Sequence, residues 1–300
     1  MIIRRTLLLG AGALALTIGI NTIGQAVELD PKAVAYIKPD DFKWRNPPGA
    51  GPNNGVSFWG DGTKPGFYGG ITQWNKGNNF SRPHFHPNDR FIYVLKGTWW
   101  NGTGTAFDPD NTVPMRAGTL VTHHAKGIHW DGAKEEDAML LIIGDGPATN
   151  TPAQQTEGKF DGKLNAQFVT FKTPDQFVWR DPSNASPTNQ SILVGDPSKT
   201  GIYVNINRFK PGNFSRPHFH PNDRYIMVLK GTWWVGTGTT FDQNATVPMP
   251  AGTFVKHFGK QVHFDGAKDE EVILQIVGYG PSGTIRLRPE EGMFGAWRKP

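Results

Sequence analysis

Most of the chain consists of two similar copies. Residues 79–90 (NFSRPHFHPNDR) recur without change at 213–224, and VLKGTWW occurs at both 94–100 and 228–234. The offset of 134 to 135 residues is longer than a solenoid repeat and is about the size of a complete small domain. The duplication therefore predicts two similar domains in one chain.

The domain boundaries follow from the duplication and from local composition. A stretch rich in Pro, Thr and Gln lies between the two copies and is the natural linker. The predicted segments are, in chain order, an export signal peptide (1–26), a first domain (27–150), a linker (151–163), a second domain (164–285) and a C-terminal tail (286–300).

Residues 1–26 have the pattern of an export signal. Arg4 and Arg5 precede an apolar stretch, residues 6–20, that is shorter than the roughly 20 residues needed to span a bilayer. The mature protein is therefore expected to be periplasmic or secreted, without a stable membrane anchor. The arginine pair leaves two export routes open, the twin-arginine route and the ordinary secretory route.

The composition favours β-structure and limits the chemistry. Gly (37 residues) and Pro (24 residues) are frequent, charged residues make up only 19%, and short apolar or alternating runs such as 91–95 and 225–229 lie between turn residues. An all-β sandwich or barrel is expected for each unit. The chain has no Cys, which excludes thiolate catalysis and thiolate metal sites.

The positive net charge does not predict nucleic-acid binding. The formal charge is +5, but Lys and Arg are spread along the chain and no basic run exceeds two residues. A nucleic-acid interface would need these charges clustered on one face or stripe. A nucleic-acid partner is therefore not expected.

All nine histidines lie in the duplicated motifs, and eight of them form pairs at the 134-residue offset. Side chains alternate along a strand, so the two imidazoles of a His-x-His segment face the same side and can bind one ion together. The pairs are His84 with His218, His86 with His220, His123 with His257, and His129 with His263. His124 corresponds to Phe258 in the other copy.

These motifs resemble those of the cupin family, whose small barrels are double-stranded β-helices. The resemblance covers both units and implies an all-β bicupin with two tandem barrels. The cupin pattern has two His, a Glu, a Gly seven residues later and then a third His. By resemblance, a divalent transition metal (Fe, Cu, Mn or Zn) would bind to His84, His86 and His129 in the first unit and to His218, His220 and His263 in the second, with room for two ions per chain.

The chain departs from the cupin pattern at the acidic ligand, because Arg90 and Arg224 stand where the pattern has Glu. Counting by twos from His84 aims Arg90 at the metal. A guanidinium cannot be a ligand, and at about 4 Å from a divalent ion it would cost about 8 kcal/mol at an effective dielectric of 20. Three arrangements would relieve this repulsion: an anion bridges metal and Arg, the Arg turns away and pairs with an acid such as Asp89, or the Arg replaces the metal.

The sequence leaves the roles of two further pairs of residues open. His123 and His257 would either supply a fourth nitrogen or lie outside the ligand set, on the exterior or hydrogen-bonded to the ligands. Asp131 and Asp265 follow the third His of each unit and would either orient its ring or simply form an Asp-Gly turn.

The predicted function is that of an exported metal-binding bicupin, with an enzyme favoured over a binding protein. With Fe, Cu or Mn, the resemblance implies a dioxygenase-like oxidoreductase acting on a small anionic or oxygen-rich compound, with Arg90 and Arg224 as catalytic anchors. A Zn-dependent hydrolase of esters or carbonyl compounds and a non-catalytic binding or storage protein are the alternatives. The protein would be a monomer or a homodimer.

Overall fold

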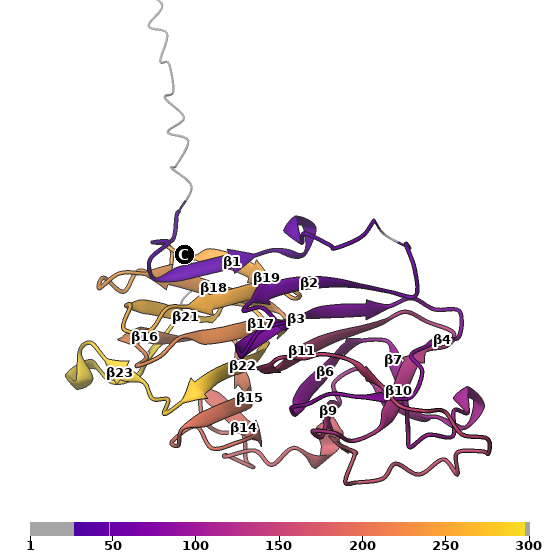
Figure 1. Ribbon diagram of the computed structural model, residues 1–300. Helices are drawn as coiled ribbons and strands as arrows, with labels where there is room; N and C mark the ends of the chain where they lie inside the picture. Colours follow the sequence, from indigo (N-terminus) through magenta and orange to yellow (C-terminus); the bar gives the residue numbers. More distant parts are fainter. Residues whose placement is uncertain (1–26, 48, 298–300) are drawn as a thin grey trace, which may run out of the picture.

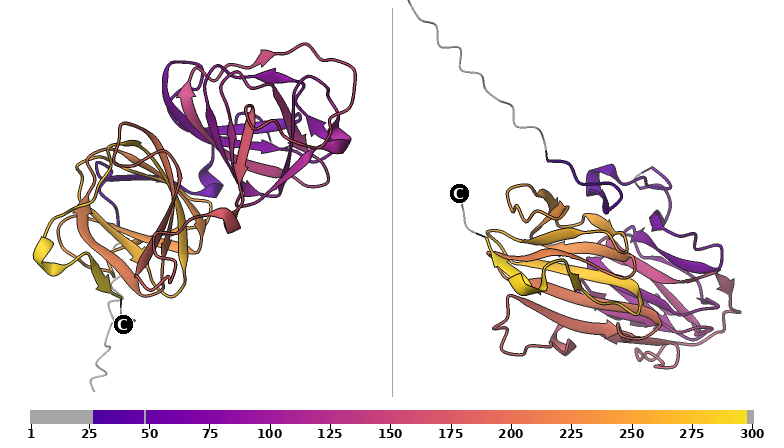
Figure 2. Two further views of the ribbon diagram at one scale, coloured as in Figure 1. Left: turned by 90° about the horizontal axis from the view of Figure 1, so that it is seen from below. Right: turned by 90° about the vertical axis from the view of Figure 1, so that its left-hand side faces the viewer.

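The computed structural model describes residues 27–47 and 49–297, so the predicted export signal lies outside the described residues. The fold is all-β: within the described part of the chain there are 24 strands and four short 3-10 helices (η), and no α-helix. Among the same residues, none of the helical segments is long and apolar enough to cross a bilayer. Figure 1 shows the strands gathered into two barrels, and the left view of Figure 2 looks along them.

Barrel 1 is built from two six-stranded sheets. The first has the order β13-β9-β6-β11-β3-β2, and the second has β12-β5-β10-β7-β8 with β4 beside β10. The strands are β2 (Asn53–Trp59), β3 (Gly66–Trp74), β4 (Asn79–Phe80), β5 (His84–Phe85), β6 (Arg90–Lys96), β7 (Thr98–Thr103), β8 (Val113–Arg116), β9 (Leu120–His123), β10 (His129–Ala133), β11 (Ala138–Gly146), β12 (Thr151–Pro152) and β13 (Val169–Lys172).

Barrel 2 repeats this arrangement. Its sheets have the orders β1-β20-β17-β22-β15-β14 and β19-β18-β21-β16-β23, with β24 beside β16. The strands are β1 (Val34–Ile37), β14 (Thr188–Val194), β15 (Gly201–Phe209), β16 (Asn213–Phe219), β17 (Arg224–Lys230), β18 (Thr232–Thr237), β19 (Val247–Pro250), β20 (Phe254–His257), β21 (His263–Ala267), β22 (Val272–Gly280), β23 (Ile285–Arg286) and β24 (Phe294–Ala296). The 3-10 helices are η1 (Pro39–Asp41), η2 (Pro109–Asn111), η3 (Pro174–Gln176) and η4 (Pro289–Glu291).

The two barrels exchange one strand each. Strand β1 precedes barrel 1 in the sequence but pairs with β20 of barrel 2, where Val34 lies opposite His257. Strand β13 precedes barrel 2 but pairs with β9 of barrel 1, where Val169 lies opposite His123. Each exchanged strand therefore covers an edge of the sheet that carries an inner histidine.

The duplicated Gly of the cupin pattern forms the turn between two strands in each barrel. Gly97 joins β6 to β7 with φ of 72°, and Gly231 joins β17 to β18 with φ of 73°. A Cβ at Gly97 would lie 2.0 Å from the carbonyl oxygen of Asp137. No other residue fits this turn, because both the positive φ and the close backbone approach exclude a side chain.

Apolar side chains hold the barrels together as well as filling them. The interface between them contains a stacked pair of rings, Trp59 on Tyr225, and a second stacked pair, Phe58 on Phe254, each with centroids 4.4 Å apart. Buried aliphatic residues from both barrels surround these rings in one apolar cluster. Aromatic contacts of this kind add to the gain from burying apolar area, so the two barrels form one packed unit.

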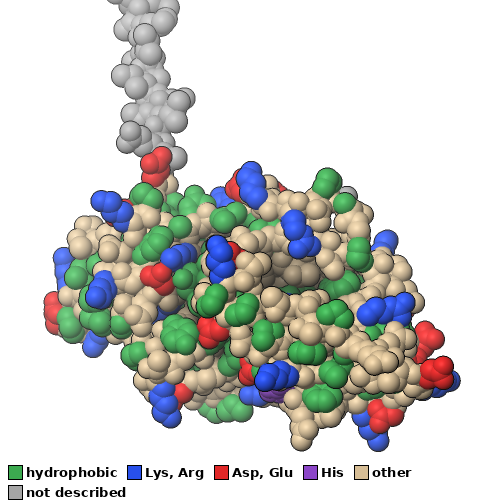
Figure 3. Space-filling model, viewed as in Figure 1, with side chains coloured by type: hydrophobic (Ala, Val, Ile, Leu, Met, Phe, Trp, Pro, Cys, Tyr) green, Lys and Arg blue, Asp and Glu red, His purple; other side chains and the backbone are tan. Residues whose placement is uncertain are grey.

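Charged side chains of both signs are interspersed on the face of the molecule shown in Figure 3. On that face Lys and Arg do not gather into a stripe, which agrees with their spread along the sequence.

Candidate metal centres

The structure brings together the three predicted histidines of each barrel. His84 in β5 is the cross-strand partner of His129 in β10, and His218 in β16 is the partner of His263 in β21. His86 and His220 follow just after β5 and β16. In each triad the candidate ligand atoms lie within 4.8 Å of one another, and all six rings are buried.

Hydrogen bonds to carbonyl oxygens place the proton of each ring on Nδ1, so Nε2 carries the lone pair that could bind a metal. In His86 and His220 this lone pair accepts from an arginine. In barrel 1, Nδ1 of His84 donates to the Arg82 carbonyl (2.8 Å), and Nδ1 of His129 donates to the Gly127 carbonyl (2.9 Å). A carbonyl can only accept, so the proton is on Nδ1 and the lone pair is on Nε2. The Nδ1 atoms of the other triad members are likewise bonded to carbonyl oxygens, those of Thr149, Arg216, Gly283 and Gln261.

The third histidine of each triad has a buried nitrogen with no hydrogen-bond partner. These atoms are Nε2 of His129 and Nε2 of His263. An unpaired buried acceptor is costly unless something else satisfies it. Three convergent imidazole lone pairs are a donor set suited to a divalent transition metal, so the residues present fit such an ion.

Burial favours the neutral form of His86, His129 and His263. It lowers the pKa of His86 to about 3, with a further contribution from the charge of Arg90. Burial also holds the pKa of His129 and of His263 well below the usual value, and the neighbouring histidines add to this effect. Neutral rings are the form that binds a metal.

Arg90 and Arg224 both point into the barrels. The Nη1 atom of Arg90 donates to Nε2 of His86, and Nη1 of Arg224 donates to Nε2 of His220 at 3.1 Å. The carboxylate of Asp89 instead accepts from the backbone N–H of Ala125 at 2.7 Å. The arrangement in which Arg90 turns away and pairs with Asp89 is therefore absent from the structure. The metal-replacing arrangement keeps the arginine where it lies, whereas the anion-bridged arrangement requires it to release Nε2 of His86.

His123 and His257 lie inside the barrels, directly beside the third ligand. The ring of His123 is 3.7 Å from that of His129, centroid to centroid, and His257 is 3.8 Å from His263. Nε2 of His123 is hydrogen-bonded to Oδ1 of Asn101 at 3.0 Å. An exterior position for these two histidines is thus wrong. His124 is half-buried and bonded to Thr170 Oγ1.

Asp131 and Asp265 are buried next to the triads, and burial raises the pKa of both carboxyl groups. Oδ2 of Asp131 lies 3.9 Å from Nε2 of His129, on the side where a metal would bind. The ring of His129 is oriented through Nδ1 by the Gly127 carbonyl instead. Asp131 therefore does not orient the ring in the way the sequence suggested.

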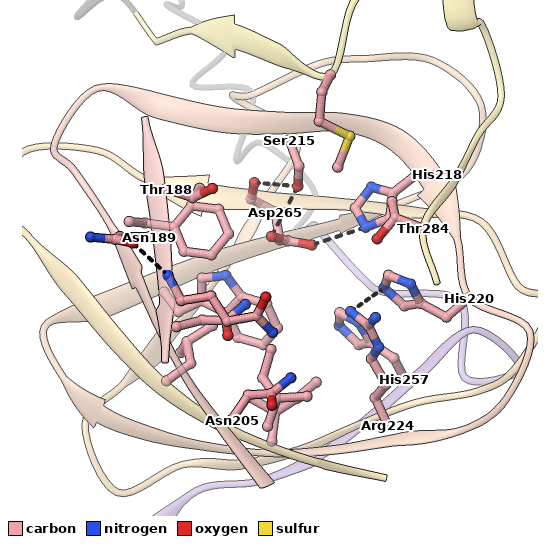
Figure 4. Close-up of a pocket in the computed structure, with 18 of the residues that line it drawn as sticks. Thr188, Asn189, Asn205, Ser215, His218, His220, Arg224, His257, Asp265 and Thr284 are labelled. Carbon is pink, nitrogen blue, oxygen red and sulfur yellow. Dashed lines mark hydrogen bonds and ion pairs between the residues drawn. The ribbon is translucent and has the colours of Figure 1, made fainter. Parts of the chain in front are cut away.

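A cavity of about 380 Å³ opens onto the triad of barrel 1, and one of about 360 Å³ opens onto that of barrel 2 (Figure 4). The sequence analysis missed Arg45 and Arg180, which line these cavities from the segments before β2 and β14. Their presence at matching positions of the two copies, in Phe-x-Trp-Arg, was the available signal. Each cavity thus has a second arginine besides the one at the histidines.

The cavity walls differ between the barrels. Asn205 and Asn207 of β15 line the cavity of barrel 2 and pair with Ile276 and Leu274 of β22. The corresponding partners of Ile142 and Leu140 in barrel 1 are Gly70 and Thr72. Buried amide oxygens of Asn205 and Asn207 have no hydrogen-bond partner. No feature of the sequence motifs indicated this difference.

The chain folds into two double-stranded β-helix barrels, and each barrel holds one buried histidine triad. Among solved structures, the chain is similar to a putative glyoxylate-induced protein of Pseudomonas aeruginosa (14% identity, TM-score 0.58, covering 93% of this chain and 97% of that one). It is also similar to a mutant of the Bacillus subtilis oxalate decarboxylase OxdC (14%, TM-score 0.55, covering 84% and 79%) and to salicylate 1,2-dioxygenase of Pseudoaminobacter salicylatoxidans (13%, TM-score 0.53, covering 74% and 72%).

At these identities the likeness shows the fold alone, and it supports the predicted cupin barrels. No protein-family model matches the sequence, and no curated protein matches it.

Proposed function

We propose that the protein is a metal-dependent oxidoreductase of the dioxygenase type that acts on a small anionic or oxygen-rich compound. His84, His86 and His129 would hold one divalent ion, and His218, His220 and His263 a second. The observation that carries the proposal is the convergence, in each cavity, of three buried imidazoles with a guanidinium.

The protein's own residues would bind and orient the substrate. A bound Fe, Cu or Mn ion would supply redox chemistry with oxygen. Arg90 and Arg224 would bind an anionic group of the substrate through paired N–H donors, as guanidinium groups do with carboxylates. Ile92, Leu140 and Ile142 line the same cavity in barrel 1 and would exclude water from the bound compound.

The structural neighbours support a metal and a small anionic substrate. The Bacillus subtilis oxalate decarboxylase has Mn(II) centres, and the salicylate 1,2-dioxygenase structure contains adducts with gentisate. Oxalate, salicylate and gentisate are carboxylates, for which an arginine in the cavity is a suitable partner.

Elemental analysis and an oxygen-consumption assay test the proposal. The mature protein, purified without chelator, is expected to contain about two equivalents of one transition metal, and the Fe-, Cu- or Mn-loaded form is expected to consume oxygen with one of a panel of carboxylates and diketones. Oxygen consumption by none of these forms, together with ester cleavage by the Zn form, would replace the proposal with a hydrolase. Protein without metal would favour a binding or storage role.

Four further parts complete the proposal. The protein would be exported to the periplasm or secreted, because residues 1–26 resemble a signal peptide. Arg90 and Arg224 would stand in place of the acidic ligand of the cupin pattern. Each unit of the duplication would form one domain, apart from the strands β1, β12 and β13, which pair with the other unit or lie in the linker. The chain would act as a monomer or as a homodimer.

A further inference from the structure

Each third histidine shares its strand with an acid two residues further on. His263 and Asp265 both belong to β21, and His129 and Asp131 both belong to β10. Residues two apart on a strand point to the same face of the sheet. The carboxylate of the aspartate therefore enters the same interior space as the imidazole before it.

In barrel 2 the carboxylate faces two of the candidate ligand nitrogens at once. Oδ2 of Asp265 lies 3.9 Å from Nε2 of His218 and 3.9 Å from Nε2 of His263. Figure 4 shows Asp265 between Ser215 and His218. Two donors bound to the same ion, each about 2.1 Å from it, are at most about 4.2 Å apart, so the separation suits a shared ion.

The proton positions call for a cation between these atoms. The Nδ1 atoms of His218 and His263 donate to carbonyl oxygens, so their Nε2 atoms present lone pairs to the carboxylate. A carboxylate oxygen and an imidazole lone pair are both acceptors and do not bond to each other. A metal ion between them would satisfy both groups, including the Nε2 of His263 that has no other partner.

The second carboxylate oxygen of Asp265 is already held. Oγ of Ser215 donates to Oδ1 at 3.0 Å, which fixes the carboxylate and leaves Oδ2 directed at the histidines. Asp265 is only 4% exposed, and a buried carboxylate is costly without a cation nearby. Its negative charge would also offset part of the repulsion between a divalent ion and Arg224.

We infer that Asp265 in barrel 2 and Asp131 in barrel 1 supply the anionic metal ligand that the first motif lacks. The acidic ligand has thus moved from the strand that carries the arginine to the strand that carries the third histidine. This inference rests on the proposed metal sites. It assigns Asp265 as a ligand beside His218 and His263, and Asp131 as a ligand beside His129. The arginine would bind the substrate once it releases the Nε2 atom of His220 or His86.

The test isolates barrel 2 by substituting His84→Gln and His86→Gln, so that a single site remains. Co(II) is the probe, with its Kd measured by chelator competition and its visible d–d spectrum recorded. Asp265→Asn, which removes the charge but keeps the size, is expected to raise the Kd on the order of 100-fold and to change the spectrum, because the ligand set changes. Ser215→Ala is expected to have a smaller effect, since it only releases Oδ1.

Asp269→Asn is the matched control, because it makes the same charge change at an exposed position of barrel 2 and is expected to alter neither quantity. An unchanged Kd and spectrum in Asp265→Asn would overturn the inference. If Asp265→Asn does not fold, the same test is made on barrel 1: His218→Gln and His220→Gln remove the site of barrel 2, and Asp131→Asn is compared with its parent protein. Wild-type protein that binds no Co(II) overturns both proposals, whereas protein that binds metal but consumes no oxygen overturns the proposed function alone.

Discussion

Arg224 and His220 share the carbonyl oxygen of Gly283. Nδ1 of His220 donates to this oxygen at 2.7 Å, Nη2 of Arg224 donates to it at 3.4 Å, and Nη1 of Arg224 donates to Nε2 of the same imidazole at 3.1 Å. The guanidinium therefore occupies the lone pair that a metal would use. In barrel 1 Arg90 makes the equivalent contact with His86, so metal and arginine compete for one nitrogen in each barrel.

Replacing the arginine with an acid is expected to separate metal binding from anion binding. Arg90→Glu removes the competing donor and adds a carboxylate, so metal affinity should rise about tenfold or more, as expected for a gain of at least about 1.4 kcal/mol. Binding of benzoate to barrel 1 should be lost. Chelator competition and titration calorimetry measure the two effects.

Arg116→Glu is the control for this substitution, because Arg116 is exposed at β8 of the same barrel. Benzoate binding that persists in Arg90→Glu would mean that the guanidinium does not hold the anion.

The stability of the metal-free protein is expected to fall with decreasing pH below about 6.5. Burial lowers the pKa of His86 to about 3 in the folded protein, while an unfolded histidine keeps a pKa near 6.5. Between these values only the unfolded chain gains the proton, so each such histidine reduces the free energy of unfolding by about 1.4 kcal/mol per pH unit. Denaturant unfolding at pH 7.5, 6.5, 5.5 and 5.0 measures the slope.

The raised pKa values of Asp131 and Asp265 have the opposite effect on the pH dependence of stability. A buried carboxyl takes up its proton more readily in the folded chain, so these groups favour folding as the pH falls. These two groups offset only part of the effect of the buried histidines. The substitution His86→Gln should reduce the slope by about 1.4 kcal/mol per pH unit. An unchanged slope would show that His86 is not a buried neutral group in solution.

The inner histidines of the two barrels, His123 and His257, differ in their hydrogen-bond partners. Asn101 bonds to Nε2 of His123, whereas Val235 occupies the corresponding position of barrel 2, and Nε2 of His257 is buried without a partner. Asn101→Val is therefore expected to destabilise the protein by about 1 to 3 kcal/mol, because it leaves Nε2 of His123 buried without a partner. Urea unfolding measures the change. An unchanged free energy of unfolding would contradict the assignment.

The exchanged strand β1 is expected to matter for barrel 2, although it lies next to barrel 1 in the sequence. Deleting residues 27–38 removes the buried Ala33 and Val34 and exposes the edge of β20. The Tm should fall by several degrees, since burial of each such side chain is worth about 1 to 2 kcal/mol. Hydrogen exchange should increase in β20 and remain unchanged in β9, and equal effects in both strands would contradict this assignment.

The sequence alone was sufficient to predict the fold class and the meeting of the histidines. The duplication indicated two units, and two-residue alternation predicted that His84 and His86 face the same side. Arg90 also faces the cavity, although it begins β6, which a break at residues 86–89 separates from β5 and which belongs to the other sheet. The direction of His123 was not predictable, because a turn separates it from His129 and the count by twos does not carry across it. The exchange of β1 was also hidden, since a four-residue apolar run does not specify which sheet edge it covers.

The position of the carboxylates of Asp131 and Asp265 was also not predictable from the sequence. Asp131 and Asp265 were noted beside the third histidine, but an Asp-Gly pair has a common explanation as a turn. The 3.9 Å distances from Oδ2 to the Nε2 atoms show that the carboxylates face the metal-binding side of the rings, which the sequence did not indicate.

The reciprocal placement of β1 and β13 gives the chain the form of a fused two-fold dimer. In each half, the strand that precedes a barrel leaves it and completes the other one. Two separate copies of a single-barrel protein would be joined in this way if they swapped their first strands. Cutting the chain between the barrels would therefore yield two fragments that each lack a strand held by the other, and that would need to reassociate before either cavity could be restored.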